Sequence, residues 1–164
     1  GLRKTKKNKK DSINAIVVLG KNEHNVEGII KFKEEKTGIR IKYKITGLTD
    51  GLHGFHIHEY GDLTQGCASA CDHFNPFHKK HGSLVHHERH EGDLGNVYSK
   101  NQKSEGSIFA KGLCLTANNK LSVLGRMIVV HEKEDDLGMG GDEESLKTGN
   151  AGARVACGVI GLCK

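Results

Sequence analysis

Nine of the eleven histidines of this chain lie within residues 53–90, and this concentration constrains the fold more than any other feature of the sequence. His56 and His58 stand two residues apart in an apolar run rich in β-forming residues. On a strand, side chains at that spacing point to the same face. The chain is therefore expected to present two imidazoles together from one rigid surface, which supplies half of a site for a nitrogen-binding metal.

Three further histidines recur downstream in a glycine-rich, charged stretch. His73, His81 and His90 follow one another at intervals of eight and nine residues, and Asp93 closes the series. No single helix or strand face accommodates that spacing, so a loop has to wrap around to bring these side chains together. Three imidazoles and one carboxylate are a typical tetrahedral zinc set, whereas calcium and magnesium prefer oxygen ligands.

The remaining histidines are interpreted differently. His86 and His87 are expected to be surface residues, and His53 and His78 are also expected not to be metal ligands. His131 ends the apolar run RMIVVH, and the local sequence alone predicts a surface residue at the end of a strand.

The rest of the chain has the pattern of an antiparallel β protein. In IRIKYKIT (39–46), apolar residues alternate with Arg, Lys and Thr, which is typical of a strand with one buried and one wet face. Further strands are expected at 13–20, 26–32, around His56 and His58, and near 94–99, 105–112, 122–130 and 154–161. Two long loops, 61–93 and 132–153, separate them, with a short helical turn expected at 143–147. Strands without intervening helices predict an all-β antiparallel sandwich or barrel.

Charge divides the chain into a short segment and a body. Residues 1–10 hold six Lys or Arg and no acid, and without them nineteen basic residues face twenty acidic ones. This charge distribution predicts a basic, disordered tail at 1–12, and the length of the remainder predicts a single domain at 13–164. The tail has no aromatic residue, so nucleic-acid binding is not expected. The chain has no run of 18 apolar residues and no signal-like apolar stretch, which predicts a cytoplasmic protein that does not span a membrane, and no membrane partner is expected.

The motifs around these histidines resemble the copper/zinc superoxide dismutase family over nearly the whole chain, from about residue 13. They are GFHIHEYGD (54–62), GCASACDHFNP (66–76), HG (81–82), RHEGDLGN (89–96), GRMIVVHEKEDDLGMGG (125–141) and GNAGARVACGVIG (149–161). The resemblance implies an eight-stranded Greek-key β-barrel, immunoglobulin-like, with two functional loops. It also implies one copper and one zinc per subunit. The implied copper ligands are His56, His58, His73 and His131, and the implied zinc ligands are His73, His81, His90 and Asp93.

The same resemblance assigns the remaining roles. His73 bridges the two metals and carries a proton, and Arg154 docks the anionic substrate beside the copper. Asp135 links the copper ligand His56 to the zinc ligand His81. Cys67 and Cys157 form the disulfide of the subunit. The implied activity is the disproportionation of superoxide to dioxygen and hydrogen peroxide, an antioxidant oxidoreductase reaction.

The implied partners are superoxide and a second copy of the chain, through residues 60–61, 124–125 and 159–162. Ala153 and Val155 stand where some members carry prolines linked to a copper chaperone, so strict dependence on a chaperone is not expected. Cys71 replaces a usual glycine; it could pair wrongly with Cys157, offer a thiol on the path to the copper, or be a spectator. A decoy that binds other dismutases or copper chaperones, and a copper carrier, stay open as alternatives. They are disfavoured because inactive relatives usually lack ligands that are present here.

Overall fold

The structure, a computed structural model, describes residues 12–164. The expected basic tail therefore lies outside the described residues, except for Ser12. The described part contains eight strands of five or more residues: β1 (Asn14–Leu19), β2 (Glu27–Glu35), β3 (Gly38–Thr46), β4 (Gly51–His58), β6 (Asp93–Ser99), β7 (Lys103–Lys111), β8 (Met127–His131) and β9 (Arg154–Val159). Two shorter strands, β5 (Thr64–Cys67) and β10 (Gly161–Cys163), a 3-10 turn (Ala68–Ala70) and α1 (Ser145–Thr148) complete it.

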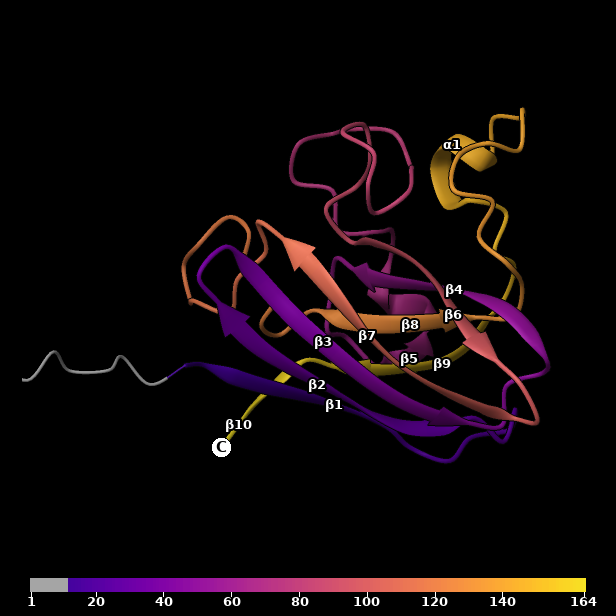
Figure 1. Cartoon of the computed structure of the whole chain (residues 1–164), viewed down its shortest axis with the longest axis horizontal. Coiled ribbons are helices and arrows are strands. Elements are labelled where there is room, and N and C mark those ends of the chain that lie inside the picture. Colours follow the sequence, from indigo (N-terminus) through magenta and orange to yellow (C-terminus); the bar gives the residue numbers. More distant parts are fainter. Residues whose placement is uncertain (1–11) are drawn as a thin grey trace, which may run out of the picture.

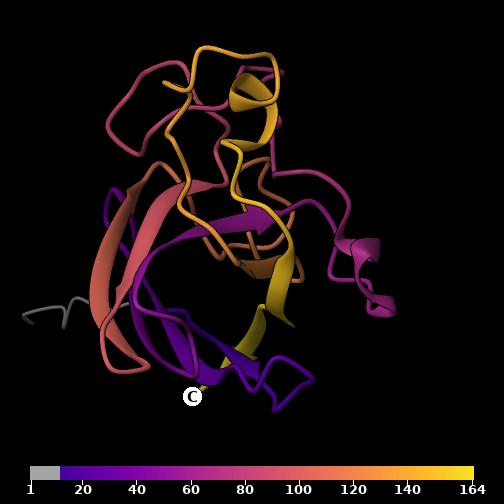
Figure 2. The same ribbon diagram turned by 90° about the vertical axis from the view of Figure 1, so that its right-hand side faces the viewer.

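The strands form two antiparallel sheets, as the sequence predicts. One sheet has the order β10-β1-β2-β3-β7 and the other the order β6-β4-β8-β9. Figures 1 and 2 show the second long loop, which carries α1, and the later part of the first loop projecting together at one end of the sheets, whereas β5, in the earlier part of the first loop, lies beside β9. No helix in the described part of the chain is both long and apolar enough to cross a membrane.

One apolar core fills the space between the sheets, and the alternation of each strand determines what enters it. In β3, Ile39, Ile41 and Ile45 are buried in this core, while Lys42 and Lys44 are exposed, which confirms the predicted pattern. In β4, Phe55 and Ile57 belong to the same core. His56 and His58 alternate with them and therefore face away from the core, on the outer side of the four-stranded sheet.

Two predicted strands have different bounds in the structure. The strand expected at 122–130 begins only at Met127, because a turn precedes it: Arg126 N–H donates to Val123 O, and Gly125 has a left-handed φ of 80°. The strand expected at 154–161 is interrupted at Ile160, whose backbone bonds to Gly125 and Arg126 instead. As a result β9 belongs to the four-stranded sheet and β10 to the five-stranded one. The turn predicted at 143–147 is the short helix α1.

Candidate metal centre

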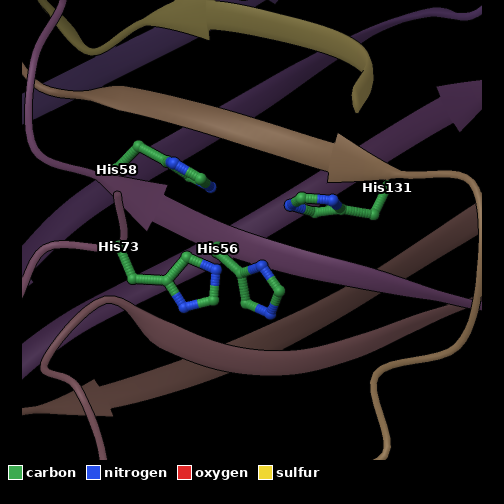
Figure 3. A group of neighbouring side chains, drawn as sticks. All are labelled: His56, His58, His73 and His131. Carbon is green, nitrogen blue, oxygen red and sulfur yellow. The ribbon is translucent and has the colours of Figure 1, made fainter. Parts of the chain in front are cut away.

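Four histidines from three segments meet on the outer side of the four-stranded sheet. His56 and His58 come from β4 and His131 from the end of the neighbouring strand β8, and His73 is held beside His58 by an antiparallel bridge. All four are buried, and their ligand atoms lie within 4.8 Å of one another. Figure 3 shows the four rings turned toward a common space.

Hydrogen bonds fix which nitrogen of each ring faces that space. His56 Nε2 lies 2.7 Å from Asp135 Oδ2, His58 Nδ1 lies 2.7 Å from the carbonyl oxygen of Cys71, and His131 Nδ1 lies 3.0 Å from that of Gly152. Because these oxygens only accept, each ring must carry its proton on the bonded nitrogen.

The opposite nitrogens, His56 Nδ1, His58 Nε2 and His131 Nε2, are buried and have no hydrogen-bond partner. Buried polar atoms without partners are costly, and three lone pairs converging on one point satisfy the requirement of a copper ion for nitrogen ligands. The residues present therefore fit a copper ion at this point.

A second cluster adjoins the first and contains His73, His81, His90 and Asp93. Asp93 Oδ1 lies 2.9 Å from His73 Nδ1, 2.9 Å from His81 Nδ1 and 3.2 Å from His90 Nδ1. His81 Nδ1 is buried and makes no aligned hydrogen bond. Three imidazole nitrogens and one carboxylate oxygen, gathered this closely, supply the four donor atoms that a tetrahedral zinc ion prefers. His56 also lies within 4.8 Å of His73, His81 and Asp93. Its Nε2 is bonded to Asp135, however, and its Nδ1 faces the first cluster.

His73 belongs to both clusters. Its Nδ1 faces Asp93 and lies 3.1 Å from His90 Nδ1, so only its Nε2 is left for the first cluster. This placement is the one that a shared ligand requires.

Asp135 connects the two clusters through the ring nitrogens that face away from the proposed metal positions. Its carboxylate is fully buried and accepts from His56 Nε2 and from His81 Nε2, each at 2.7 Å. The side chain of Asn96 clamps its backbone: Asp135 N–H donates to Asn96 Oδ1 at 2.8 Å, and Asn96 Nδ2 donates to Asp135 O at 3.0 Å. A carboxylate in this position orients both rings and fixes their tautomers.

The pKa shifts separate the residues of the two clusters into neutral and charged groups. Burial lowers the pKa of His56 and His58 well below the usual value, and it lowers the pKa of His131 to about 4, so these rings are neutral near pH 7. Burial alone would raise the pKa of Asp93, but hydrogen bonds with the three imidazoles reverse this and hold it far below its usual range. Burial opposes the charged form of His81 as well, yet Asp135 and Asp93 raise its pKa to about 9. The second cluster thus favours a cationic guest.

Arg154, at the start of β9, borders the first cluster. Its guanidinium donates to the carbonyl oxygen of Cys67 at 2.7 Å and to that of Cys71 at 2.5 Å. The predicted disulfide between Cys67 and Cys157 is present and ties this segment to β9. Both connections hold the guanidinium in a fixed place.

A pocket of about 1130 Å³ opens over the first cluster. Cationic side chains predominate among the charged groups that line it: Arg154, Lys79, Lys80, Lys133 and Lys147, with Glu59, Asp72 and Glu144. Such a pocket attracts small anions toward its floor, where His58, His73 and His131 lie.

The four histidines expected not to be ligands belong to neither cluster. His86 and His87 are exposed as predicted, and so is His78. His53 is buried, 3% exposed, and its ring nitrogens lie 2.9 Å from His131 O and 2.8 Å from Thr49 O. His131 is likewise buried rather than exposed, because the loop after it folds over the ring and supplies Gly152 O.

Sequence reasoning missed three contributions to this centre. Arg89 is buried and donates to the carbonyl oxygens of His90 and Glu91, at 3.1 and 3.3 Å, which stiffens the loop that carries His90. Asn96 holds Asp135, and the carbonyl of Cys71 orients both His58 and Arg154. The first two look like ordinary polar residues in sequence, and the third is a backbone group, which no side-chain pattern reveals.

Comparison with known proteins agrees with these observations. The family model described as copper/zinc superoxide dismutase matches residues 26–160. The protein is 50% identical to superoxide dismutase [Cu-Zn] A of Xenopus laevis over 152 residues, covering 92% of this chain and 99% of the relative. It is 52% identical to superoxide dismutase [Cu-Zn] of Kluyveromyces lactis over 154 residues, covering 92% and 97%.

Similarity extends to a viral relative and to a solved structure. The superoxide dismutase [Cu-Zn] of Paramecium bursaria Chlorella virus 1 is 49% identical over 154 residues, covering 93% of this chain and 80% of the relative. The crystal structure of the clock protein EA4 is 45% identical with a TM-score of 0.86, covering 92% of this chain and 94% of that one. Fold, the two clusters of potential ligands and sequence together show that the chain belongs to the copper/zinc superoxide dismutase family.

Proposed function

We propose that this protein disproportionates superoxide, converting two superoxide ions and two protons into one dioxygen and one hydrogen peroxide. The observation that carries the proposal is the convergence of three unpartnered, buried imidazole nitrogens beneath a cationic pocket, two of them on His58 and His131, which line it. A bound copper ion supplies a one-electron redox couple there, which zinc lacks. The decoy and carrier alternatives fit less well, since neither needs a cationic pocket that leads to the metal.

The proposed ligand roles follow from the free nitrogens. His56 Nδ1, His58 Nε2, His131 Nε2 and the remaining nitrogen of His73 would hold copper. The set His73, His81, His90 and Asp93 would hold zinc through the atoms that converge on Asp93 Oδ1.

Arg154 would bind the substrate. Its guanidinium is held at the pocket floor by two carbonyl oxygens and offers a fixed positive charge to an incoming anion. Lys133 and Lys147, on the rim of the same pocket, would guide superoxide toward it.

His73 would move the proton. Its Nδ1 belongs to the proposed zinc set, so with that site filled a proton taken up by the ring would reside at Nε2, which faces the substrate space. From Nε2 the proton can pass to the reduced oxygen species, and the ring can take up another from the pocket.

Superoxide consumption by purified protein, with copper and zinc counted per chain in the same sample, tests the proposal. Turnover should rise in proportion to copper content and fall in His131→Ala, which removes one free nitrogen. Full copper and zinc occupancy with negligible turnover would favour a carrier or a decoy instead.

We also propose a homodimer formed through residues 60–61, 124–125 and 159–162. Its support is an exposed apolar margin, in which Tyr60 is 55% and Leu162 is 66% exposed, around a close backbone contact of Gly61 with Gly125 O. A twofold contact would bury these side chains on both copies. Sedimentation velocity should give twice the chain mass, and Leu162→Glu, at an exposed position, should give monomers; a monomeric wild type would contradict the proposal.

Maturation without a dedicated copper chaperone is a further part of the proposal. It rests on Ala153 and Val155, which flank Arg154 where some family members carry prolines. Expression in cells that lack the chaperone should yield active protein with an intact Cys67–Cys157 disulfide. Inactive protein with reduced cysteines would contradict this expectation.

A further inference from the structure

The outer face of the five-stranded sheet carries a compact group of cations. Lys31 and Lys33 project from β2, and Arg40, Lys42 and Lys44 project from β3, all on the side away from the core. We term this group the basic face. Lys31 stands directly opposite Lys42, and Lys33 directly opposite Arg40, in the register of the two strands.

Folding alone does not account for this arrangement. Like charges directly opposite each other on neighbouring strands destabilise a sheet. Lysines often protect edge strands from unwanted pairing, but β2 and β3 are interior strands with partners on both sides. Within residues 12–164, Arg40 pairs with Glu35 at 3.3 Å, whereas Lys31 and Lys42 form no ion pair. A binding partner that supplies negative charge would offset this repulsion.

The basic face has a shallow hollow. Its volume is about 420 Å³, and its charged lining includes Lys31, Lys33, Arg40 and Lys42, with one carboxylate, Glu35. Without residues 1–10 and the five cations of this face, fourteen basic residues remain against twenty acidic ones. The positive charge of the face is therefore local.

We propose that the basic face docks this protein on the surface of a lipid bilayer that contains anionic headgroups. Clusters of four to eight Lys or Arg bind such surfaces, each cation near the surface contributing separately. A sheet face is broad enough for cations from two strands to meet a planar bilayer at the same time.

Nucleic acid fits this face less well. Four of the five cations are lysines, whereas arginine is the residue that recognises phosphate and bases with paired donors. The aromatic ring at this face, Phe109, lies under the Arg40 guanidinium at 4.8 Å and is not free to stack on a base.

Docking through this face leaves the metal pocket open. The metal-binding histidines lie on the outer side of the four-stranded sheet, and the basic face lies on the outer side of the other sheet, with the core between them. In Figure 2 the indigo strands β1 and β2 lie away from α1 and the loops that cover the metal centre. Docking would place the protein at a membrane surface, and it does not depend on the proposed superoxide activity.

Co-sedimentation with vesicles tests the proposal. The full chain should sediment with phosphatidylcholine vesicles containing about one third phosphatidylserine, but not with phosphatidylcholine alone, and should be released at about 1 M salt. In Lys31→Gln/Lys33→Gln/Lys42→Gln, apparent affinity should fall roughly 100-fold, since each cation contributes about fivefold. The triple Lys→Arg variant at these positions should bind like the wild type, which controls for folding.

A matched variant separates local charge from net charge. Lys21→Gln/Lys100→Gln/Lys120→Gln removes the same number of exposed cations away from the basic face and should keep affinity within about threefold of the wild type. The proposal is overturned if the wild type does not sediment with the anionic vesicles, or if both triple glutamine variants bind with equal affinity. Tighter binding to a DNA duplex than to the vesicles would also overturn it.

Discussion

Asp135 is the residue whose replacement tests the architecture of the metal centre most directly. With a carboxylate at this position, His56 and His81 both keep their protons on Nε2, and both Nδ1 lone pairs face the metals. Asp135→Asn preserves the shape but turns one acceptor into a donor. The ring that faces the amide NH₂ must then carry its proton on Nδ1, the atom that would bind the metal.

The size of the effect follows from these contacts. Loss of an outer hydrogen-bond acceptor typically lowers metal affinity about 10–100-fold. At least one of the two metals should therefore be held that much more weakly. The metal-free protein loses one buried, charge-assisted hydrogen bond, so its free energy of unfolding should fall by about 2 kcal/mol.

Competition with a chelator, followed separately for copper and zinc, measures the affinities, and urea unfolding of metal-free protein measures the stability. Asp136→Asn is the matched control, because Asp136 bonds Ser145 and Asn150 and no histidine ring. If Asp135→Asn keeps both affinities within about twofold of the control, the carboxylate does not position the ligands and the reasoning is wrong.

Three further outcomes are expected. Arg154→Ala should retain both metals but lose about 10–100-fold in kcat/KM, seen in stopped-flow superoxide decay, because the anion loses a charged hydrogen bond. Arg89→Gln should lower zinc retention about tenfold in the chelator assay, since the loop that carries His90 is held less firmly. Metal-free protein should lose stability as pH falls from about 6.5 toward 4, measured by urea unfolding, because the unfolded chain protonates His131 before the folded one does.

Local patterns were sufficient to predict the strands and the two loops. The alternation in 39–46 and the same-face pair His56 and His58 depend on strand geometry alone, and the structure confirms both. The interruption at Ile160 was not predictable in this way. It depends on a backbone pairing with Gly125 and Arg126, which lie some 35 residues away in sequence.

The centre was only partly predictable for the same reason. Spacing identified the loop histidines and Asp93, because their repetition within one loop is visible in sequence. For His131 the local sequence predicted an exposed residue, whereas the residue is buried because a loop folds back over it. Asp135 and Arg154 were identified only through resemblance to the family, since a carboxylate 79 residues from His56 leaves no local signal of their contact.

The backbone conformation of Cys71, a departure from the family pattern, predicts a measurable change in stability. The family usually has glycine there, and Cys71 has φ 59° and ψ −138°, a conformation that costs a residue with a side chain about 1–3 kcal/mol. Cys71→Gly removes this strain but adds about 0.4–1 kcal/mol of unfolded-chain entropy. Metal-free Cys71→Gly should thus be about 1 kcal/mol more stable, with Tm about 2–4 °C higher.

Cys71→Ala is the control for that experiment, because it removes the thiol without relieving the backbone and should leave Tm unchanged. Scans at one fixed protein concentration and without reductant compare the three proteins, so that any dimer contributes equally. Equal gains in both variants would place the cost in the thiol, through wrong pairing with Cys157, and would contradict the backbone argument. A lower Tm in the glycine variant would mean that the Cys71 side chain itself stabilises the segment that positions Arg154 and His58.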